Sequence, residues 1–311
     1  REKKRAEITL HSIGDGVITA DLAGRIEYLN SAAIEITEWK KEDAVGQDLF
    51  KVFNKSADHD QKQIVNSVLL AMHGNKIVQS SKPVQIERSD GHHYAIEYSA
   101  SPILDEDTRV VGAVLAFRNI TALRNMAHQM AYQATHDSLT GLINRKEFEN
   151  LLAKAIDMAR NENRRHVLCY MDLDQFKVVN DTCGHIAGDE MLKQVTALLC
   201  GEIRKSDILG RLGGDEFGIL LYDCDTEEAL EKVEKLREFV RDYHFVWENK
   251  SFETGVSIGI VSINEGSGGL TEVLSAADSA CFAAKDLGRN RCHVYQLNDL
   301  ILEQRKNEMQ W

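Results

Sequence analysis

Acidic residues adjoin strand-like sequence at two places in the chain. The first is Asp172-Leu173-Asp174, which follows the apolar run at residues 166–171. A carboxylate at the end of a buried strand is costly unless it is solvated, paired or bound to a metal ion. Mg²⁺ takes oxygen ligands of this kind and leaves coordination positions for phosphate oxygens. Taken alone, this short pattern fits a solvated strand end better than a metal site.

A second acidic pair, Asp215 and Glu216, comes directly after Gly213-Gly214. The flanking runs at residues 207–212 and 217–221 are strand-like, so we predict a hairpin with the two glycines in its turn. Glycine lets a backbone approach a ligand closely. Acidic clusters on neighbouring strand ends would be able to hold two cations about 4 Å apart, the arrangement used for in-line phosphoryl displacement. The two clusters together therefore predict phosphoryl-transfer chemistry.

The composition is that of an ordinary globular protein with more than one domain. The chain has 311 residues, of which 43% are hydrophobic and 28% are charged; single cores rarely grow beyond about 250–300 residues. The formal net charge of -12 makes the chain a poor general binder of nucleic acid. Nucleotides stay possible, because a divalent cation bridges carboxylates to phosphate. No apolar run approaches the roughly 20 residues of a membrane span, so we expect no membrane segment in this chain.

The first third of the chain predicts a mixed α/β domain with antiparallel strands. A turn at Asp21-Leu22-Ala23-Gly24 and a second at Ser89-Asp90-Gly91 separate β-rich runs. The expected order is two strands, helices and three strands. The expected strands are residues 16–20, 25–29, 84–87, 94–101 and 110–117, and the expected long helix is residues 58–73.

This first segment resembles a PAS domain. The resemblance depends on the two turns above, on Asn30-Ser31-Ala32-Ala33 and on the closing Arg118-Asn119-Ile120-Thr121. It implies a sensor domain, but the sequence does not identify its ligand. The segment has no cysteine, which excludes a flavin–cysteine adduct. Four histidines of the segment fit polar surface positions better than haem ligation: His59, His73, His92 and His93.

A helix without Gly or Pro is expected from residue 123 to residue 136. Leu123, Met126 and Met130 recur at spacings of three and four, which is typical of a coiled-coil seam. The same stripe would equally pack on its own domain, and the sequence leaves both interpretations open. The position between two domains favours a signalling helix.

The second domain resembles the GGDEF diguanylate cyclases. The central motif is Arg211-Leu212-Gly213-Gly214-Asp215-Glu216-Phe217, and further motifs agree with it in order over residues 135–295. The further motifs are residues 137–145, 172–181, 184–189 and 255–259, and Ala276, Asp278 and Ala280 leading to residues 284–290. The resemblance implies a domain that joins two GTP molecules into cyclic di-GMP.

The resemblance also implies a role for individual residues. Mg²⁺ (or Mn²⁺) would be held by Asp172, Asp215, Glu216 and the Leu173 backbone carbonyl. The catalytic residues would be Asp215, Glu216 and Lys285. GTP would be bound by Asn180 and Asp189 at the guanine, and elsewhere by Phe176, Lys177, Gly213, Gly214, Lys285 and Arg289.

Arg204-Lys205-Ser206-Asp207 lies just upstream of the predicted hairpin. It matches the Arg-x-x-Asp inhibitory site of the family, which implies that cyclic di-GMP is both product and inhibitor. A guanidinium stacks on guanine while the carboxylate accepts hydrogen bonds from the edge of the base. Arg237 is expected to contribute to the same site from a neighbouring helix.

The resulting expectation is a cytoplasmic homodimer of fold class α/β (α+β). It comprises a PAS sensor domain at residues 1–121 with a short N-terminal helix, a signalling helix at 122–135 and a cyclase domain at 136–297 with a central mixed sheet flanked by helices. Residues 298–311 resemble the start of an EAL phosphodiesterase domain, so the chain is expected to be a fragment of a PAS–GGDEF–EAL protein, with an upstream membrane anchor left open.

Two rivals to this interpretation belong to other classes of protein. One is a module that binds GTP or cyclic di-GMP without chemistry, and the other is an interaction protein with an inert acidic hairpin. The complete acidic and basic set of the motif argues against the binding module, and the absence of any nucleotide-dependent thermal shift would favour the interaction protein. The absence of a Gly-x-x-x-x-Gly-Lys-Ser/Thr loop excludes a conventional P-loop nucleotidase.

Overall fold

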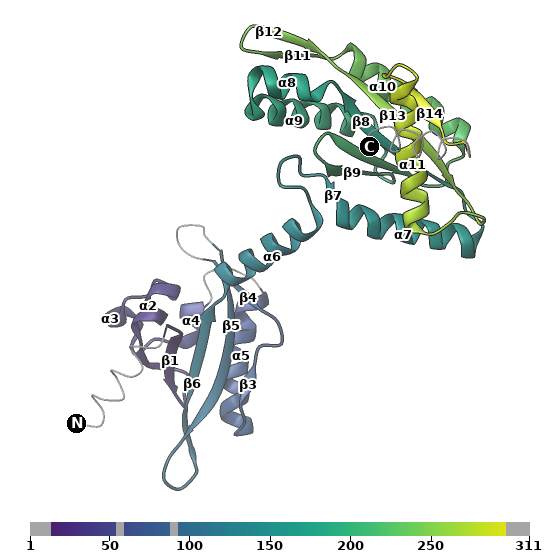
Figure 1. The fold of residues 1–311 in the computed structure, drawn as a ribbon. Coiled ribbons are helices and arrows are strands. Elements are labelled where there is room, and N and C mark those ends of the chain that lie inside the picture. Colours follow the sequence, from purple (N-terminus) through teal and green to yellow (C-terminus); the bar gives the residue numbers. More distant parts are fainter. Residues whose placement is uncertain (1–13, 54–58, 88–92, 297–311) are drawn as a thin grey trace, which may run out of the picture. The chain divides into compact units, whose positions relative to one another are not determined.

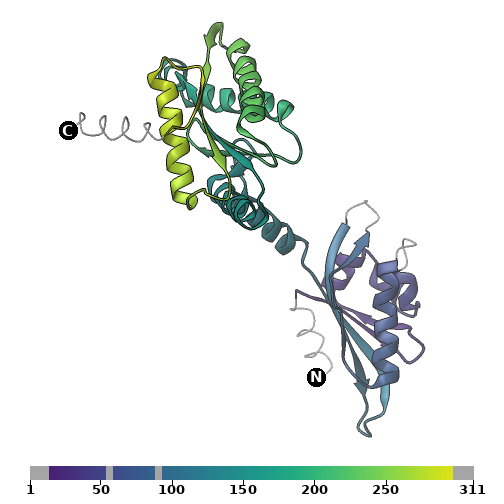
Figure 2. The ribbon, with the colours of Figure 1, turned by 90° about the vertical axis from the view of Figure 1, so that its right-hand side faces the viewer.

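The computed structural model describes residues 14–53, 59–87 and 93–296. Four sequence predictions lie outside these residues: the incoming N-terminal helix, the turn at 89–91, His92 and the segment at 298–311. The chain divides into two compact units between Gln129 and Met130, inside helix α6 (Thr121–Thr135). The elements are labelled in Figure 1, and Figure 2 shows the same ribbon after a quarter turn.

The first unit is a sheet of antiparallel strands with helices packed on it, as the sequence predicts. Its strand order is β2-β1-β6-β5-β3, and β4 also pairs with β5. The short strand β3 was not expected from the sequence. The strands are β1 (Gly16–Asp21), β2 (Ile26–Leu29), β3 (Val78–Gln79), β4 (Val84–Glu87), β5 (His93–Leu104) and β6 (Val110–Asn119). The helices are α2 (Ser31–Thr37), α3 (Lys41–Ala44), α4 (Leu49–Phe53) and α5 (His59–Gly74).

Asn30, a polar residue of the PAS-like motif, is fully buried. Its side-chain oxygen accepts hydrogen bonds from the backbone of Val17 and of Ala33, so it joins β1 to the first turn of α2. Elsewhere in the same core, the rings of Phe53 of α4 and Phe117 of β6 meet edge to face at 5.7 Å. The Asn30 hydrogen bonds help to fix α2 on the sheet, and the aromatic pair helps to fix α4.

The second unit has a central six-stranded sheet of mixed orientation, which confirms the predicted architecture. The order is β14-β13-β8-β10-β9-β7, with parallel pairing at the two edges and antiparallel pairing between. The strands are β7 (Ile143–Asn144), β8 (His166–Asp174), β9 (Ile208–Gly213), β10 (Glu216–Leu221), β13 (Gly255–Ile263) and β14 (Cys292–Val294), with β11 (His244–Trp247) and β12 (Lys250–Glu253) forming a separate hairpin. The helices are α7 (Arg145–Glu162), α8 (Phe176–Cys183), α9 (His185–Glu202), α10 (Thr226–Asp242) and α11 (Leu270–Asp286).

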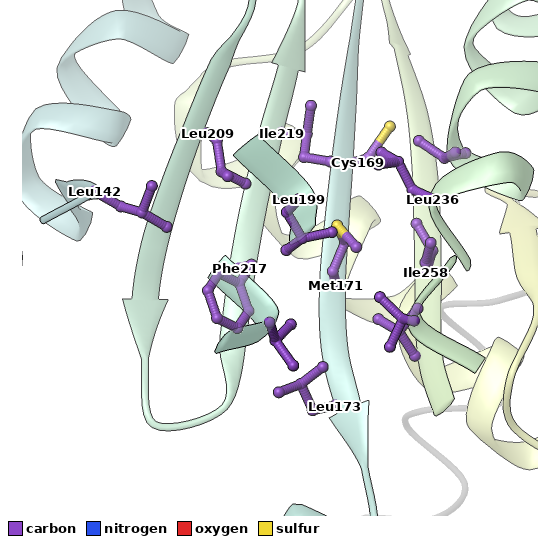
Figure 3. Packing of buried hydrophobic residues seen from close by; sticks show 14 of the residues in the cluster. Leu142, Cys169, Met171, Leu173, Leu199, Leu209, Phe217, Ile219, Leu236 and Ile258 are labelled. Atoms are coloured by element: carbon purple, nitrogen blue, oxygen red, sulfur yellow. The ribbon is translucent and has the colours of Figure 1, made fainter. Parts of the chain in front are cut away.

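Alternation along β8 sends its side chains to two different cores. Cys169, Met171 and Leu173 pack with α9 and α10 on one face, beside Phe217 of β10 (Figure 3). Leu168 and Tyr170 pack with α7 and α11 on the other face. Because successive strand residues point to opposite faces, Asp172 and Asp174 follow Tyr170 toward the α11 side.

The hairpin between β9 and β10 differs slightly from the prediction. Its two turn residues are Gly214 and Asp215, whereas Gly213 already pairs with Glu216. Gly214 adopts a left-handed φ of 49°, which L-residues with a side chain rarely adopt. Asp215 therefore projects from the turn itself, and Glu216 opens the following strand.

Candidate active site

Register brings the two acidic clusters of the sequence together. Asp172 of β8 lies directly opposite Glu216 of β10. The Leu173 backbone N–H donates to the Asp215 carbonyl at 3.2 Å, so the hairpin turn is fastened to β8 at this point. Directly opposed residues on antiparallel strands have Cβ atoms about 4.5–5.5 Å apart. Three acidic residues thus occupy one end of two paired strands.

Lys285, near the end of α11, supplies the positive charge at this cluster. Its Nζ lies 2.6 Å from Asp172 Oδ2, and the Asp172 side chain is only 15% exposed. Burial raises the pKa of Asp172 to about 6; the Lys285 ammonium opposes this shift, and the charges of Asp215 and Glu216 add to it. One ammonium among three carboxylates leaves the site with excess negative charge.

Lys285 itself stays protonated. Burial disfavours its charged form, but the ion pair with Asp172 outweighs burial, so the pKa of Lys285 is raised. Arg289 lies one turn further along the chain, in the left-handed segment that follows α11. Lys285 therefore contacts the acidic cluster from α11, whereas Arg289 lies beyond the end of that helix and lines a pocket with Asp174.

Asp174, the second acidic residue of the Asp-x-Asp pattern, has a structural role. Its carboxylate accepts from Ser257 Oγ at 2.8 Å and from the Asn290 backbone N–H at 2.9 Å. These bonds tie the end of β8 to β13 and to the residue after Arg289. The sequence pattern gave no means of separating this buried anchor from Asp172.

Asn180 and Asp189 lie on either side of the tight connection between α8 and α9. Gly184, with φ 83°, ends α8 and begins α9. The Asn180 side chain reaches across to α9 at Gly188, the residue just before Asp189, since a Cβ built on Gly188 would lie 2.0 Å from Asn180 Oδ1. Phe176 and Lys177 form the first turn of α8, where helical N–H groups lack partners within the helix.

Sequence reasoning missed the role of Arg211. Its Nε and Nη2 donate to the Gly214 carbonyl at 3.0 and 2.8 Å, and its Nη1 donates to Asp137 Oδ1 at 3.1 Å. Burial opposes ionisation of Asp137, but hydrogen bonds from Thr140 and Arg211 outweigh it and lower the pKa of Asp137. Arg211 thereby connects the acidic turn to the segment just after α6. The sequence signal for this role was that Arg211 belongs to the hairpin motif at residues 211–217.

Tyr170 is a second residue that the sequence analysis did not single out. It lies two residues before Asp172 on the same face of β8 and is 6% exposed. Burial raises the pKa of its hydroxyl, and a hydrogen bond to Glu216 acts in the same direction. Period-two spacing from Asp172 was the signal that pointed to this position.

The expected product site is assembled only in part. Arg204 Nη2 lies 3.6 Å from Glu228 of α10, and Asp207 accepts from the Tyr222 backbone N–H at 3.3 Å. Arg237 instead bonds Glu234 at 2.7 Å and approaches Asn290 at 3.4 Å. It comes about two and a half helical turns after Glu228, so it points away from Arg204. The contribution of Arg237 to a product site therefore stays a prediction.

Lys232 is a basic residue of α10 that lies near Arg204, as Glu228 does. It pairs with Glu228 at 2.9 Å, one turn further along the same face of the helix. Burial disfavours the charged form of Lys232, but the hydrogen bond to Glu228 outweighs burial, so the pKa of Lys232 is raised. Repulsion from Arg204 opposes this rise, which indicates that the two cations are close. A Lys-rich helix offers no sequence signal that selects this one residue.

The acidic cluster fits a metal ion that arrives with its substrate. Within residues 14–53, 59–87 and 93–296, no three His, Cys, Asp or Glu side chains are arranged to enclose a metal ion. Mg²⁺ commonly uses only one or two protein carboxylates together with substrate phosphates. Asp172 and the turn residue Asp215 supply such carboxylates, and the excess negative charge favours a divalent cation.

Comparison with known proteins assigns both units. Residues 134–291 match the family model "Diguanylate cyclase, GGDEF domain", and residues 5–120 match the model "PAS fold". In the described part of the chain, no helix has the length and apolar character needed to cross a bilayer.

Two curated relatives align with nearly the whole chain. The probable diguanylate cyclase DgcE of Escherichia coli (strain K12) is 38% identical over 95% of this chain and 26% of its own length. The cyclic di-GMP phosphodiesterase PdeB of Shewanella oneidensis is 32% identical over 100% of this chain and 35% of its own length. The chain thus spans about a quarter to a third of these relatives.

A solved structure resembles the second unit. It contains the coiled coil and GGDEF domain of DgcB from Caulobacter crescentus in complex with c-di-GMP. The match has a TM-score of 0.53 and 28% sequence identity, and it covers 56% of this chain and 93% of that one.

Proposed function

The chain belongs to the GGDEF diguanylate cyclase family, and from that premise we propose that its second unit condenses two GTP molecules into cyclic di-GMP and two pyrophosphates. The observation that carries the proposal is the pairing of Asp172 with Glu216, beside Asp215 in the turn and Lys285 at 2.6 Å. Acidic residues and one ammonium at the end of paired strands suit a metal-bound triphosphate.

A divalent cation, Mg²⁺ or Mn²⁺, would be held by Asp172, Asp215, Glu216 and the Leu173 carbonyl. When bound, it neutralises charge on the phosphates and activates the attacking hydroxyl. Asp215 and Glu216 orient the reacting groups. Lys285 and Arg289 bind the triphosphate together with the backbone N–H groups of Phe176 and Lys177, and Gly213 and Gly214 leave room for it.

Asn180 and Asp189 recognise guanine. An Asp carboxylate accepts from the ring N–H and the exocyclic amine of guanine together, a donor pattern that adenine lacks. An Asn amide both donates and accepts, so it complements a second edge of the base. Both residues flank the connection between α8 and α9, which supports this assignment.

Each 3′-hydroxyl attacks the α-phosphorus of the other GTP, and pyrophosphate leaves. Because each chain offers one GTP site, two chains must face each other, and the active form is a homodimer. Leu123, Met126 and Met130 support this assignment, since all three are at least 60% exposed on α6. The PAS unit would control activity by changing how the two chains face each other.

Product inhibition would act through Arg204 and Asp207, with Lys232 adding positive charge from α10. The reaction would take place in the cytoplasm, where GTP is available. We further propose domain limits of 1–121, 122–135 and 136–297, with residues 298–311 beginning an EAL domain. The phosphodiesterase relative, which aligns with the entire chain, supports this last assignment.

Incubation with Mg-GTP and chromatography of the products tests the proposed reaction. We expect cyclic di-GMP and pyrophosphate from the unchanged protein and none from Asp215→Asn. The matched control, Asp157→Asn, alters an exposed carboxylate of α7 and should keep full activity. Folded, dimeric protein that binds Mg-GTP without turning it over would reject the enzyme in favour of a binding module.

A further inference from the structure

Gly188 lies in the first turn of α9 and is fully enclosed by neighbouring groups. A Cβ built on it would lie 2.0 Å from Asn180 Oδ1, 2.9 Å from Asn180 Cγ and 3.0 Å from Phe176 Cζ. Real Cβ atoms essentially never approach another heavy atom closer than 3.0 Å. The Asn180 side chain therefore occupies the space that any other residue at position 188 would fill.

The backbone gives no reason for glycine at this position. Gly188 is absent from the residues with positive φ, and it lies inside an α-helix. Glycine there is less favourable than alanine, because it loses more conformational freedom on folding. The residue is thus explained by the side chain that passes over it, and not by its own conformation.

Contact with Gly188 also determines where the Asn180 amide points. Among the residues that the structure describes, no hydrogen bond holds this side-chain amide in place. The Gly184 N–H donates to the backbone carbonyl of Asn180 at 2.8 Å, and this bond does not involve the amide. The amide therefore stays available to a ligand, and it packs over Gly188, the residue just before Asp189.

We propose that Gly188 is a positioning residue for guanine recognition. By having no side chain, it lets the Asn180 amide lie beside Asp189, so that both residues meet the same base. This inference rests on the proposed function, in which Asn180 and Asp189 bind guanine. Alanine at 188 would displace the Asn180 amide and weaken binding of the nucleotide without touching the acidic cluster or Lys285.

The experiment compares Gly188→Ala with Asn180→Ala and with the double variant. The probe is 3′-deoxy-GTP with Mg²⁺, which lacks the attacking hydroxyl and cannot react, so its dissociation constant is measured directly by calorimetry. Gly201→Ala is the control, because Gly201 lies in the same helix with open space around its Cβ position. Thermal melts of all four variants accompany the binding data.

Each single variant in the site should weaken binding about tenfold, the usual consequence of losing one buried hydrogen bond. The double variant should bind no more weakly than Asn180→Ala, because Gly188 acts through that side chain. It should also regain stability lost by Gly188→Ala, since the clash with Asn180 disappears. Gly201→Ala should leave binding unchanged.

Additive losses in the double variant, or full binding by Gly188→Ala, would overturn the inference. Full binding by Asn180→Ala would instead overturn the assignment of Asn180 to guanine. Conversion of GTP by the unchanged protein tests the proposed reaction separately. The two proposals can therefore fail independently.

Discussion

Asp172 carries a mostly buried carboxylate whose charge depends on its neighbours. Burial and two nearby carboxylates disfavour its ionised form, and Lys285 favours it. The resulting pKa of about 6 leaves Asp172 ionised at neutral pH by a small margin. A divalent cation would secure the ionised form, so metal binding and ionisation of Asp172 are coupled.

Removal of the Lys285 charge should therefore make Asp172 harder to ionise. We predict that Lys285→Met raises the pKa of Asp172 above 6 in metal-free protein, because the favourable ion pair is lost while burial remains. Carbon-13 NMR of the Asp172 carboxyl group measures this titration. Lys193→Met, which removes an exposed lysine of α9, is the control and should leave the titration unchanged. An unshifted Asp172 in Lys285→Met would contradict the electrostatic account.

His166 makes the second unit sensitive to acid. It is fully buried, and its Nδ1 accepts from the Asp223 N–H at 3.1 Å. Burial lowers the pKa of His166, with the Asp223 charge opposing. An unfolded histidine binds its proton near pH 6.5. Between that pH and the lower folded pKa, the unfolded chain binds more protons, so stability is full above about pH 6.5 and falls as the pH decreases.

We predict that His166→Gln reduces this loss of stability in acid. Glutamine offers an acceptor for the Asp223 N–H but does not titrate. The measurement is the difference in Tm of the second unit between pH 7.5 and pH 5.5, where about 1 kcal/mol corresponds to roughly 2–4 °C in a domain of this size. His244→Gln, at an exposed position of β11, should behave like the unchanged protein. Equal differences in all three proteins would exclude His166 as the acid-sensitive group.

At the scale of elements, the acidic turn depends on one arginine. Arg211 reaches the Gly214 carbonyl with two nitrogens and Asp137 with a third. The planar guanidinium makes this possible, and a lysine ammonium is too compact to serve both partners. The turn that presents Asp215 is thereby held by the segment directly after α6.

Arg211→Lys should consequently slow turnover without removing the nucleotide site. We predict a fall in cyclic di-GMP formation of about tenfold or more, since bonds to charged groups contribute roughly 1.5–3 kcal/mol. The dissociation constant for 3′-deoxy-GTP should stay within about threefold of the original. Arg160→Lys is the matched control on α7, where the guanidinium bonds only the Ser267 carbonyl at 2.9 Å in the described chain. Unaltered turnover in Arg211→Lys would refute the role given to Arg211.

The sequence predicted these elements well where a continuous apolar run or a glycine turn marked them. The apolar run of β8 and the glycine hairpin placed Asp172, Asp215 and Glu216 at adjacent strand ends, and the mixed sheet follows from the same pattern. The sequence did not reveal the contact from Asp137 to Arg211, which joins residues 74 positions apart. Such contacts depend on the register of strands, which local patterns do not encode.

The surroundings of Arg237 were not predictable from the sequence for a different physical reason. The sequence predicted the helix correctly, but the face that α10 turns toward Arg204 depends on packing against the sheet. Val233, Leu236 and Val240 are buried there and determine the rotation of the helix. This rotation places Glu228 and Lys232 near Arg204 and leaves Arg237 against Asn290. A difference of half a turn along a helix is enough to change which neighbours a side chain contacts.

At the scale of the whole molecule, α6 joins two units that each have their own core. None of its residues is buried within the chain. Leu123, Met126 and Met130 share one side of the helix by their spacing of three and four. Apolar side chains repeated in this way on an exposed helix are typical of a seam between two chains. A dimer contact along this side of α6, as proposed above, would lie next to the segment that leads to Arg211.

A charge in this seam should separate the two chains without harming either GTP site. We predict that Met126→Glu makes the turnover per chain fall steeply on dilution, because two like charges would meet across the dimer. Binding of 3′-deoxy-GTP should be unchanged, since each site lies within one chain. Turnover measured over a range of protein concentrations, with sedimentation to follow dimerisation, tests both points. His128→Glu places the same charge on the opposite side of α6 and should retain concentration-independent turnover. If Met126→Glu stayed dimeric and fully active at every concentration, the contact that makes two GTP sites face each other would have to lie elsewhere in the chain.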